Sequence, residues 1–316
     1  MSSPFASFMQ IVRGLESYRP EGVASAVALG AFDGIHLGHR AILGTAVARA
    51  RQAHLRAVAC TFDRHPMEVL QPDRAPLPIT TLDERLELIG ETGIDTTVVM
   101  AFTRAVAAVE AKRFVQDALV ETLKAREIVV GFNHRFGQGA RGDAQLLEQL
   151  AGPLGFRAHI VPALLVDGIT VSSSEIRAAL QRGDLDSAAR LLGRHYSIHG
   201  EVVRGAERGR TLGFPTANVR TDRALGLPVG VYVCEILIAG HAHRAVVNVG
   251  VRPTFGVNEL AVEAYVLDFA GDLYGQRVGL VFLRRLREER KFPSVDDLRR
   301  QIALDVAAAR RDPGPP

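Results

Sequence analysis

The chain has 316 residues, 47% of them apolar, and a formal net charge of +3. This length and composition suggest about two globular domains, and the lack of any apolar run of about 18 residues argues against a membrane-spanning helix. Its basic residues, mostly arginines, are spread along the chain, which favours anionic small substrates over nucleic acid. No secretory signal is visible. We therefore expect a cytoplasmic protein whose Cys60 and Cys234 are buried and reduced rather than zinc ligands.

The first half of the chain alternates predicted strands with predicted helices. After a weak lead-in, apolar and β-branched runs predict strands at 23–29, 58–62, 97–102, 127–131 and 158–161. Amphipathic spacing predicts helices at 40–51, 82–91, 110–123 and 143–150. This alternation is typical of a parallel sheet with helices on both faces. Ligands of such sheets bind at the carboxyl ends of the strands, so the loops after the first, second and fourth strands should converge.

The second half of the chain has a different pattern. A predicted helix at 171–192 ends at a hinge around 193–195, and strand-like runs follow at 197–203, 230–237, 243–249, 261–267 and 279–286. Glycine, proline and aspartate separate these runs, as in an antiparallel barrel or sandwich. A last helix is predicted at 294–310, with Ser294 as its N-cap. We therefore divide the chain into domains 1–186 and 187–316.

The stretch GAFDGIHLGH, at 30–39, joins the first predicted strand to its helix. His36 and His39 are three residues apart and share one face of the first helical turn. That turn offers unpaired N–H groups and the positive end of a helix dipole, and imidazoles there can stabilise charge on a transferring phosphate. Two histidines at this spacing are more often ordinary surface or core residues. Here the strand, the glycines and the helix onset together favour a nucleotide-binding turn.

Three serines lead into a helix in VSSSEIR, at 171–177. By itself this is an ordinary serine N-cap with Glu175 in the first turn. Combined with the histidine turn far upstream, it resembles the second signature of the nucleotidylyltransferase superfamily. The resemblance implies that serine hydroxyls and Arg177 hold a triphosphate opposite the histidines.

The segment GFNHRFGQGARGD, at 131–143, follows the fourth predicted strand and contains a formal GxGxxG. A dinucleotide fingerprint is excluded, because the glycines start well after the strand and no acidic residue follows at the required distance. We interpret the segment as a loop at the active edge of the sheet, with Asn133, Arg135 and Arg141 as polar contacts for a nucleotide. TFDRHP, at 61–66, leaves the second strand at the same edge.

A glycine-rich stretch at 200–219 nearly mimics a P-loop, but the first two glycines are one residue too close and Arg210 stands where lysine belongs. A glycine-rich hairpin can still wrap ATP, and Thr216 and Asn218 supply oxygen ligands suited to Mg²⁺. A plain structural turn explains these two residues equally well. Glu263 lies in an alternating strand, either solvated at an edge or directed into a site where it could accept a proton from a hydroxyl.

In this order the motifs resemble the prokaryotic bifunctional riboflavin kinase/FAD synthetase family over nearly the whole chain, from about Gly14 to Arg310. The histidine turn, the loop at 131–143 and VSSSEIR resemble its FMN adenylyltransferase half. RGRTLGFPTANV, NVGVRPTFG, VEAYVLDFAGDLYG and the last helix resemble its riboflavin kinase half. The resemblance implies an α/β fold: a Rossmann-like nucleotidylyltransferase domain with a parallel sheet, then an antiparallel β-barrel with a terminal helix.

The resemblance also implies two reactions that use ATP and Mg²⁺: phosphorylation of riboflavin to FMN, then adenylylation of FMN to FAD with release of pyrophosphate. The implied catalytic residues are Glu263, as the base of the kinase, and, for adenylylation, His36, His39 and Arg177. The implied nucleotide- and phosphate-binding residues are Gly30, Phe32, Asp33, Gly34, Gly38, Asn133, Arg135, Ser172, Ser173, Ser174, Gly205, Arg208, Gly209, Arg210, Gly213 and Pro215. The implied metal ligands are Thr216 and Asn218.

Two positions depart from the family pattern. Ala31 stands where a larger residue is more common, and residues 132–134 replace a Gly-x-Asp-Phe-type run, which leaves the roles of Asn133 and His134 open.

Three other interpretations fit the sequence less well. An adenylyltransferase with a barrel that only binds flavin would tolerate loss of Glu263 or PTAN, and both are present. A synthetase-like or RNA-binding protein would need a lysine-rich second signature, and a flavin sensor would need a DNA-binding module. The expected partners are small molecules, without nucleic acid or membrane, and a weak homo-oligomer is one state that the sequence allows.

Overall fold

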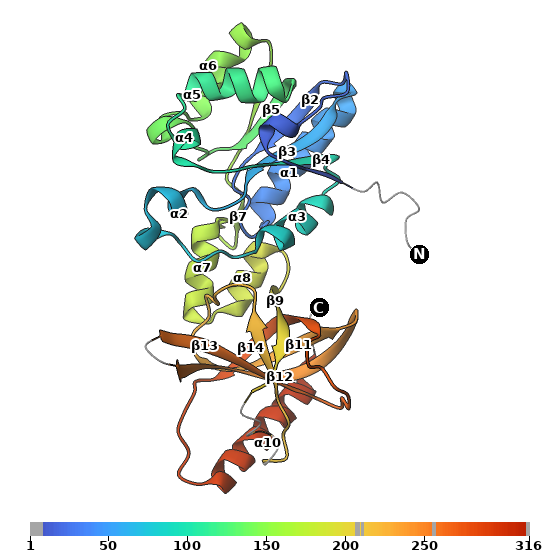
Figure 1. The fold of residues 1–316 in the computed structure, drawn as a ribbon, viewed down its shortest axis with the longest axis vertical. Helices are drawn as coiled ribbons and strands as arrows, with labels where there is room; N and C mark the ends of the chain where they lie inside the picture. The colour runs from blue at the N-terminus through green and yellow to red at the C-terminus, as the bar shows by residue number, and fades with distance from the viewer. Residues whose placement is uncertain (1–8, 206–208, 210–211, 255–256, 314–316) are drawn as a thin grey trace. The chain divides into compact units, whose positions relative to one another are not determined.

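The computed structural model describes residues 9–205, 209, 212–254 and 257–313. The chain forms two compact units, Met1–Ser173 and Ser174–Pro316, each with its own main sheet (Figure 1). In the described ranges, no helix combines the length and the apolar character that crossing a membrane requires.

The first unit is built on a parallel sheet with the strand order β1-β4-β3-β2-β5-β6. The strands are β1 Gln10–Arg13, β2 Ser25–Leu29, β3 Arg56–Phe62, β4 Thr96–Met100, β5 Ala125–Gly131 and β6 Arg157–Val161. The five predicted strands are confirmed, and β1 adds an edge strand where we expected only a weak lead-in. A short hairpin follows, formed by β7 Leu165–Val166 and β8 Ile169–Thr170.

Helices cover both faces of this sheet. They are α1 Leu37–Ala53, α2 Pro66–Leu70, α3 Leu82–Gly90, α4 Arg104–Ala107, α5 Ala111–Arg113, η3 Phe114–Thr122 and α6 Ala144–Leu154, with single turns η1 Leu15–Ser17, η2 Pro72–Arg74 and η4 Gln138–Ala140. Alternate side chains of β2 enter different cores, as the pleat requires. Val27 and Leu29 pack with η3 and α6, whereas Ala26 and Ala28 pack with α1. The predicted helix at 110–123 forms, but most of it is the π-helix η3.

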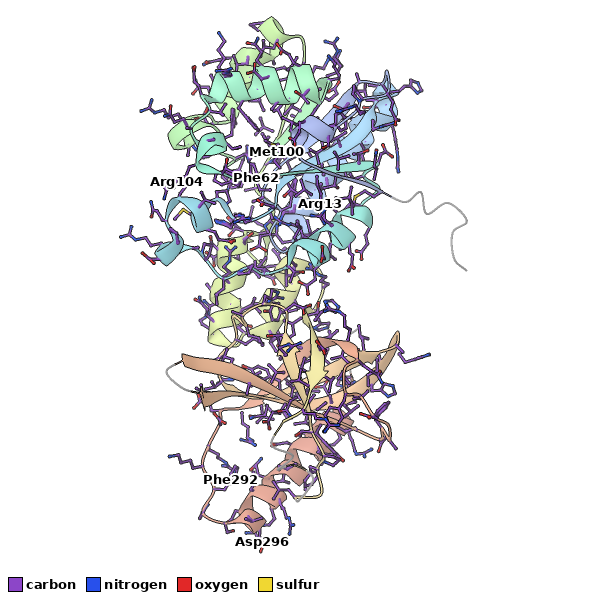
Figure 2. The ribbon with its side chains drawn as sticks, viewed as in Figure 1. Arg13, Phe62, Met100, Arg104, Phe292 and Asp296 are labelled. Atoms are coloured by element: carbon purple, nitrogen blue, oxygen red, sulfur yellow. The ribbon has the colours of Figure 1, made fainter. Side chains whose placement is uncertain are left out.

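The strand order places the histidine turn at a topological switch point. From β2 the chain moves outward to β3 and β4, and it then returns to β5 on the other side of β2. Ligands of doubly wound sheets bind at the carboxyl edge of such a point. Figure 2 labels Phe62 and Met100, the last residues of β3 and β4, which are partners in the sheet at this edge.

The segment 171–192, predicted as one helix, forms two helices, so the prediction of a single continuous helix is wrong. The structure has α7 Ser173–Arg182 and α8 Leu185–Leu192. Gly183, between them, has a φ of 72°, which suits glycine, and Asp184 caps α8 by accepting a hydrogen bond from the Ser187 amide at 3.0 Å. A glycine followed by an N-cap residue therefore ends one helix and starts the next.

The second unit contains a closed antiparallel barrel with the strand order β10-β13-β12-β11-β14-β9. The strands are β9 Tyr196–Val203, β10 Ala217–Thr221, β11 Gly230–Ile238, β12 His241–Thr254, β13 Val257–Val266 and β14 Arg277–Arg287. The five predicted runs are confirmed as strands, and β10 was missed. The terminal helix α10, Val295–Arg311, begins at the predicted cap Ser294.

The two faces of the barrel wall are distinguished by alternation along β11. Tyr232 points to the fully buried side, where it meets Phe282 at a ring distance of 5.5 Å. Its neighbours Val231 and Val233 pack instead with Ala309 of α10. The side that meets α10 is therefore the outer side of the barrel. Residues that pair with Val231 or Val233 across neighbouring strands share this outer side.

Candidate active sites

The backbone of the histidine turn has a positive φ at three residues, Phe32, Gly34 and Ile35. Gly34 has a φ of 87°, which glycine tolerates. Phe32 and Ile35 have φ values of 53° and 38°, which are unfavourable for such side chains, and both side chains are completely buried. Backbone of this kind persists only where surrounding contacts impose it, and it clusters at functional sites. Gly30 has no room for a side chain because the Phe32 ring covers it.

Asp33 fixes the centre of the turn. Its buried carboxylate accepts hydrogen bonds from the Ile79 and Thr80 amides at 3.0 Å and from the Thr80 hydroxyl at 3.2 Å. The same hydroxyl accepts a hydrogen bond from the Gly34 amide at 3.0 Å. Thr80 thus joins the side chain of Asp33 to the backbone of the next residue, Gly34.

Two carbonyl oxygens of the turn are tied by side chains from other elements. The Ala31 oxygen accepts hydrogen bonds from Arg85 at 2.6 Å and from the Thr61 hydroxyl at 3.1 Å. The Asp33 oxygen accepts one from the Ser173 hydroxyl at 3.0 Å. These contacts bring the end of β3 to the histidine turn, as predicted for the second strand, and they also bring Ser173 there.

His36 is the N-cap of α1. Its Nδ1 atom accepts a hydrogen bond from the His39 amide at 3.2 Å. Because an accepting nitrogen carries no proton, the proton of the neutral ring is on Nε2, which becomes the donor atom. The His39 ring stacks on that of His36 at 3.6 Å and meets the Phe32 ring edge-on at 5.4 Å. These two ring contacts fix the orientation of both imidazoles.

The first turn of α1 is closely covered and still offers donors. A side chain at Gly38 would lie 3.2 Å from the His36 ring and 3.6 Å from the Val171 carbonyl oxygen. The amides of Leu37 and Gly38, at the first two helical positions, have no acceptor within the helix. They add to the positive end of the α1 dipole. The arrangement suits an anion such as a phosphate.

The remaining predicted residues of this site differ in how firmly they are placed. Gly131, at the end of β5, would place a side chain 3.2 Å from Ile42 of α1 and 3.6 Å from the Asn133 amide oxygen, so Asn133 lies at the same edge as the turn. Arg135 is exposed and forms an ion pair with Asp143 at 3.1 Å. Residues farther along the chain are half-buried or exposed: Ser172, Ser174 and Arg177. Ser174 and Arg177 belong to the second compact unit, and their roles stay predictions.

His134 follows Asn133 and is half-buried, and its Nε2 atom is inaccessible to water. Its ring stacks with that of Phe136 at 5.8 Å, and its Nε2 atom has no hydrogen-bond partner among the described residues. Burial lowers the pKa of His134 to about 4. This imidazole is therefore neutral at physiological pH and contributes no charge to phosphate binding.

The second candidate site is a row of polar residues on the outer side of the barrel. Asn218 of β10 pairs with Glu263 of β13, and Glu263 pairs with Asn248 of β12. Asn248 pairs with Val231, which packs against Ala309 of α10. The row therefore lies on the outer side of the barrel, the side that α10 covers. Paired side chains of an antiparallel ladder lie about 5 Å apart. An amide, a carboxylate and a second amide therefore stand next to one another.

Two described glycines of the stretch at 200–219 lie close to Asn218 and Thr216. A side chain at Gly205 would overlap the Asn218 amide, and one at Gly209 would lie 3.0 Å from the Thr216 hydroxyl. The amide of Phe214 donates a hydrogen bond to the Gly209 carbonyl at 2.9 Å. Gly213 and Pro215 are exposed in the same loop. Arg208 and Arg210 lie outside the described residues.

A cavity of about 740 Å³ opens beside Thr216. Its polar and aromatic lining includes Tyr265, Asp268, Phe269 and Tyr274. Arg204 lies over the Tyr274 ring at 5.5 Å. A cavity of this size is large enough for a nucleotide or a flavin.

The barrel site has the chemistry of a Mg²⁺ site that is completed by a substrate. Within the described ranges, no group of three or more histidine, cysteine or acidic residues could hold a metal ion. The hydroxyl of Thr216 and the amide oxygen of Asn218 are hard donors. Mg²⁺ keeps several waters and commonly binds to few protein groups plus substrate phosphates. These two residues therefore fit Mg²⁺ and do not fit a zinc site.

Three residues that support these sites were not predicted from the sequence: Thr80, Arg85 and Asn248. Thr80 and Arg85 lie well after the turn that they hold, and nothing in their local sequence marks them. Asn248 starts NVGVRPTFG, which we had associated with the kinase half without giving Asn248 a role. The alternation of β12 and β13 was its only available signal.

Comparisons with known proteins match two different families to separate parts of the chain. A family model described as FAD synthetase matches residues 19–175, and one described as riboflavin kinase matches residues 192–312. The bifunctional riboflavin kinase/FMN adenylyltransferase of Escherichia coli K12 is 37% identical over 304 residues, covering 96% of this chain and 97% of the relative. The proteins of the same description from Pseudomonas fluorescens and Bacillus subtilis are 38% and 35% identical, over 96% and 93% of this chain.

A solved structure also matches nearly the whole chain. It is described as a macrolide-efflux protein from Streptococcus pneumoniae, with a TM-score of 0.86 and 31% identity over 96% of this chain and 99% of that one.

Proposed function

The chain belongs to the bifunctional riboflavin kinase/FMN adenylyltransferase family, and from that premise we propose which residues carry its two reactions. The enzyme phosphorylates riboflavin to FMN with ATP and then adenylylates FMN to FAD. The riboflavin kinase model matches the barrel, and the FAD synthetase model matches the parallel sheet.

In adenylylation, a phosphate oxygen of FMN attacks the α-phosphate of ATP, and the bond to pyrophosphate breaks. That nucleophile is already ionised, so the site needs no general base. Its task is to neutralise charge on the α-phosphate and on the leaving pyrophosphate. We assign this task to His36, His39 and the first turn of α1, with Asn133 at the adjacent strand end. The supporting observation is the Nδ1 contact of His36, which makes Nε2 the donor.

The other phosphate-binding residues of adenylylation come from the serine segment. We assign to it Ser172, Ser173, Ser174 and Arg177. The contact of Ser173 with the Asp33 carbonyl supports this assignment for the start of the segment. We retain 1–186 and 187–316 as the functional domains, so that α7, which carries Ser174 and Arg177, serves adenylylation.

In phosphorylation, the 5′-hydroxyl of riboflavin attacks the γ-phosphate of ATP and loses its proton. An alcohol is protonated at neutral pH, so this reaction does need a proton acceptor. We assign that role to Glu263, because the register places it between Asn218 and Asn248. Asn218 and Thr216 would hold Mg²⁺ and phosphates, and the stretch from Gly205 to Gly213, of which 206–208 and 210–211 lie outside the described residues, would cover the nucleotide. When bound, Mg²⁺ neutralises phosphate charge.

We propose that the cavity beside Thr216 holds the rest of the nucleotide. Its lining begins at Pro215 and Thr216 and continues to the aromatic rings of Phe269 and Tyr274. Phosphates at Thr216 and a base among aromatic rings would fill it from one end to the other. With two free, buried cysteines, we propose that both reactions take place in the cytoplasm.

The test is to incubate the protein with riboflavin, ATP and Mg²⁺ and to separate the flavins by chromatography. We expect FMN first and FAD later, and neither product without the divalent ion. If neither flavin forms with Mg²⁺ present, the proposed function is wrong.

A further inference from the structure

Arg85 of α3 is a buried cation beneath the histidine turn. Its side chain is almost completely inaccessible, and the residue is only 6% exposed. One guanidinium nitrogen donates to the Ala31 carbonyl at 2.6 Å and lies 3.5 Å from the Thr61 hydroxyl. Arg85 therefore contacts the first residue after Gly30, where the chain leaves β2 and enters the turn.

The surroundings of this guanidinium are unusual for a buried charge. Among the described residues it forms no ion pair, and its Nε atom has no hydrogen-bond partner. Burial lowers the pKa of Arg85, while Asp33, Asp63 and Glu68 raise it from a greater distance, and the group stays charged. A buried charge without a direct counter-ion is costly for stability. Packing alone gives no reason to keep it there.

The contact of Arg85 determines which backbone groups face a ligand. A carbonyl oxygen carries partial negative charge and repels phosphate, whereas an amide attracts it. Arg85 and Thr61 both bind the Ala31 oxygen on the protein side of the turn, and Ser173 binds the Asp33 oxygen. Because these two oxygens are occupied by hydrogen bonds, the amides and imidazoles of the turn are the groups that can contact an anion.

We infer that Arg85 is a positioning residue for adenylyl transfer: it holds the Ala31 carbonyl away from the phosphates and places a fixed positive charge behind the turn. This inference rests on the proposed function of the turn. Arg85 itself lies behind the backbone, so it acts through Ala31 and through its charge rather than by touching substrate.

The test compares Arg85→Met, Arg85→Lys and Thr61→Val, assayed with FMN and ATP. Arg85→Met removes the donors and the charge, and we expect kcat for FAD formation to fall about 10- to 100-fold, the scale of a misplaced reacting group, with less than about a threefold change in KM for ATP. Arg85→Lys keeps the charge, so its loss of kcat should be smaller: the logarithm of its fold-loss should be at most about half of that for Arg85→Met. Thr61→Val removes only the second donor and should cost less than Arg85→Met.

Riboflavin phosphorylation by the same chains is the control, and it should remain near wild type in all three variants. If Arg85→Met does not fold, Arg85→Gln replaces it, because glutamine keeps hydrogen-bond donors without the charge. Its kcat for FAD formation should lie below that of the wild type, by less than the 10- to 100-fold loss expected for Arg85→Met. The inference is overturned if the neutral variant stays within about twofold of wild type, or if lysine recovers nothing. Because His36→Ala tests the turn itself, its failure to reduce FAD formation would refute the proposed function rather than this inference.

Discussion

Asn218 of β10 and Glu263 of β13 are direct partners on adjacent strands of the barrel. On its other side β13 pairs with β12, where Glu263 is the partner of Asn248. The carboxylate therefore lies between two amides on the side of the wall that α10 covers. Gly205 touches the first of these amides, which brings the glycine-rich loop to the row. Under the proposed assignment the two reactions use different groups: a carboxylate for the hydroxyl substrate, and imidazoles with helix amides for the phosphate substrate.

His36 is expected to serve adenylylation only. His36→Ala should lower FAD formation from FMN by about 10²-fold, the scale of one lost transition-state contact, and leave riboflavin phosphorylation unchanged. It also removes a helix cap worth about 1 kcal/mol. His36→Asn is the matched control, because asparagine caps the helix without an imidazole. The asparagine variant should lose the activity and retain the stability. A loss of both activities in a folded protein would contradict the separation of the sites.

Thr80 is expected to matter through Asp33 and Gly34. Thr80→Val leaves a buried carboxylate and a buried amide each without one partner. The free energy of unfolding should fall by about 1–3 kcal/mol, and FAD formation should fall with it. Asp83→Asn changes an exposed carboxylate at the start of the same α3 and should do neither. Urea denaturation of both variants checks this, and equal stabilities would argue against the Thr80 link.

Gly205 is expected to be needed for phosphorylation because there is no space for a side chain beside Asn218. Gly205→Ala should displace the loop or the amide and reduce the kinase rate at least about tenfold. Gly226→Ala is the control in the same unit, since a methyl group there meets no atom within 4 Å. Rates of FMN formation decide the matter, and similar rates for the two variants would remove Gly205 from the site.

His134 should make the protein sensitive to acid. Burial lowers its pKa from an ordinary 6.5 to about 4, so the unfolded chain binds a proton that the folded chain rejects between these values. The contribution of His134 to the free energy of unfolding is complete above about pH 6.5 and is lost as the pH falls toward 4. The loss is at most about 3 kcal/mol. His134→Phe should therefore show a shallower loss of melting temperature on acidification. Parallel curves for variant and wild type would exclude His134 as the cause.

The elements that the sequence predicts well are those with a local signal. The strands of the sheet are continuous apolar runs, and α10 begins at a serine followed by two aspartates. The histidine turn could be located because strand, glycines and helix are contiguous there. In contrast, Gly183 and Asp184 looked like the interior of a helix, because the apolar pattern continues on both sides of them.

The features that were missed depend on contacts between distant segments. β10 is a short strand in which polar Asn218 and Arg220 alternate with Ala217 and Val219, and only its partners β9 and β13 make it a strand. The contact between Thr80 and Asp33 likewise joins a loop to a turn far earlier in the chain. Residue types could name Asn218 and Glu263 as candidates, but only the register shows that they are neighbours.

The most direct test of two separate sites is the product pattern of Glu263→Gln. This variant keeps the size and most of the polarity of the side chain but cannot accept the hydroxyl proton. Supplied with riboflavin, ATP and Mg²⁺, it should form almost no FMN and hence no FAD, whereas supplied with FMN it should form FAD at the wild-type rate. FMN formation from riboflavin near the wild-type rate, or failure to adenylylate supplied FMN, would contradict the account.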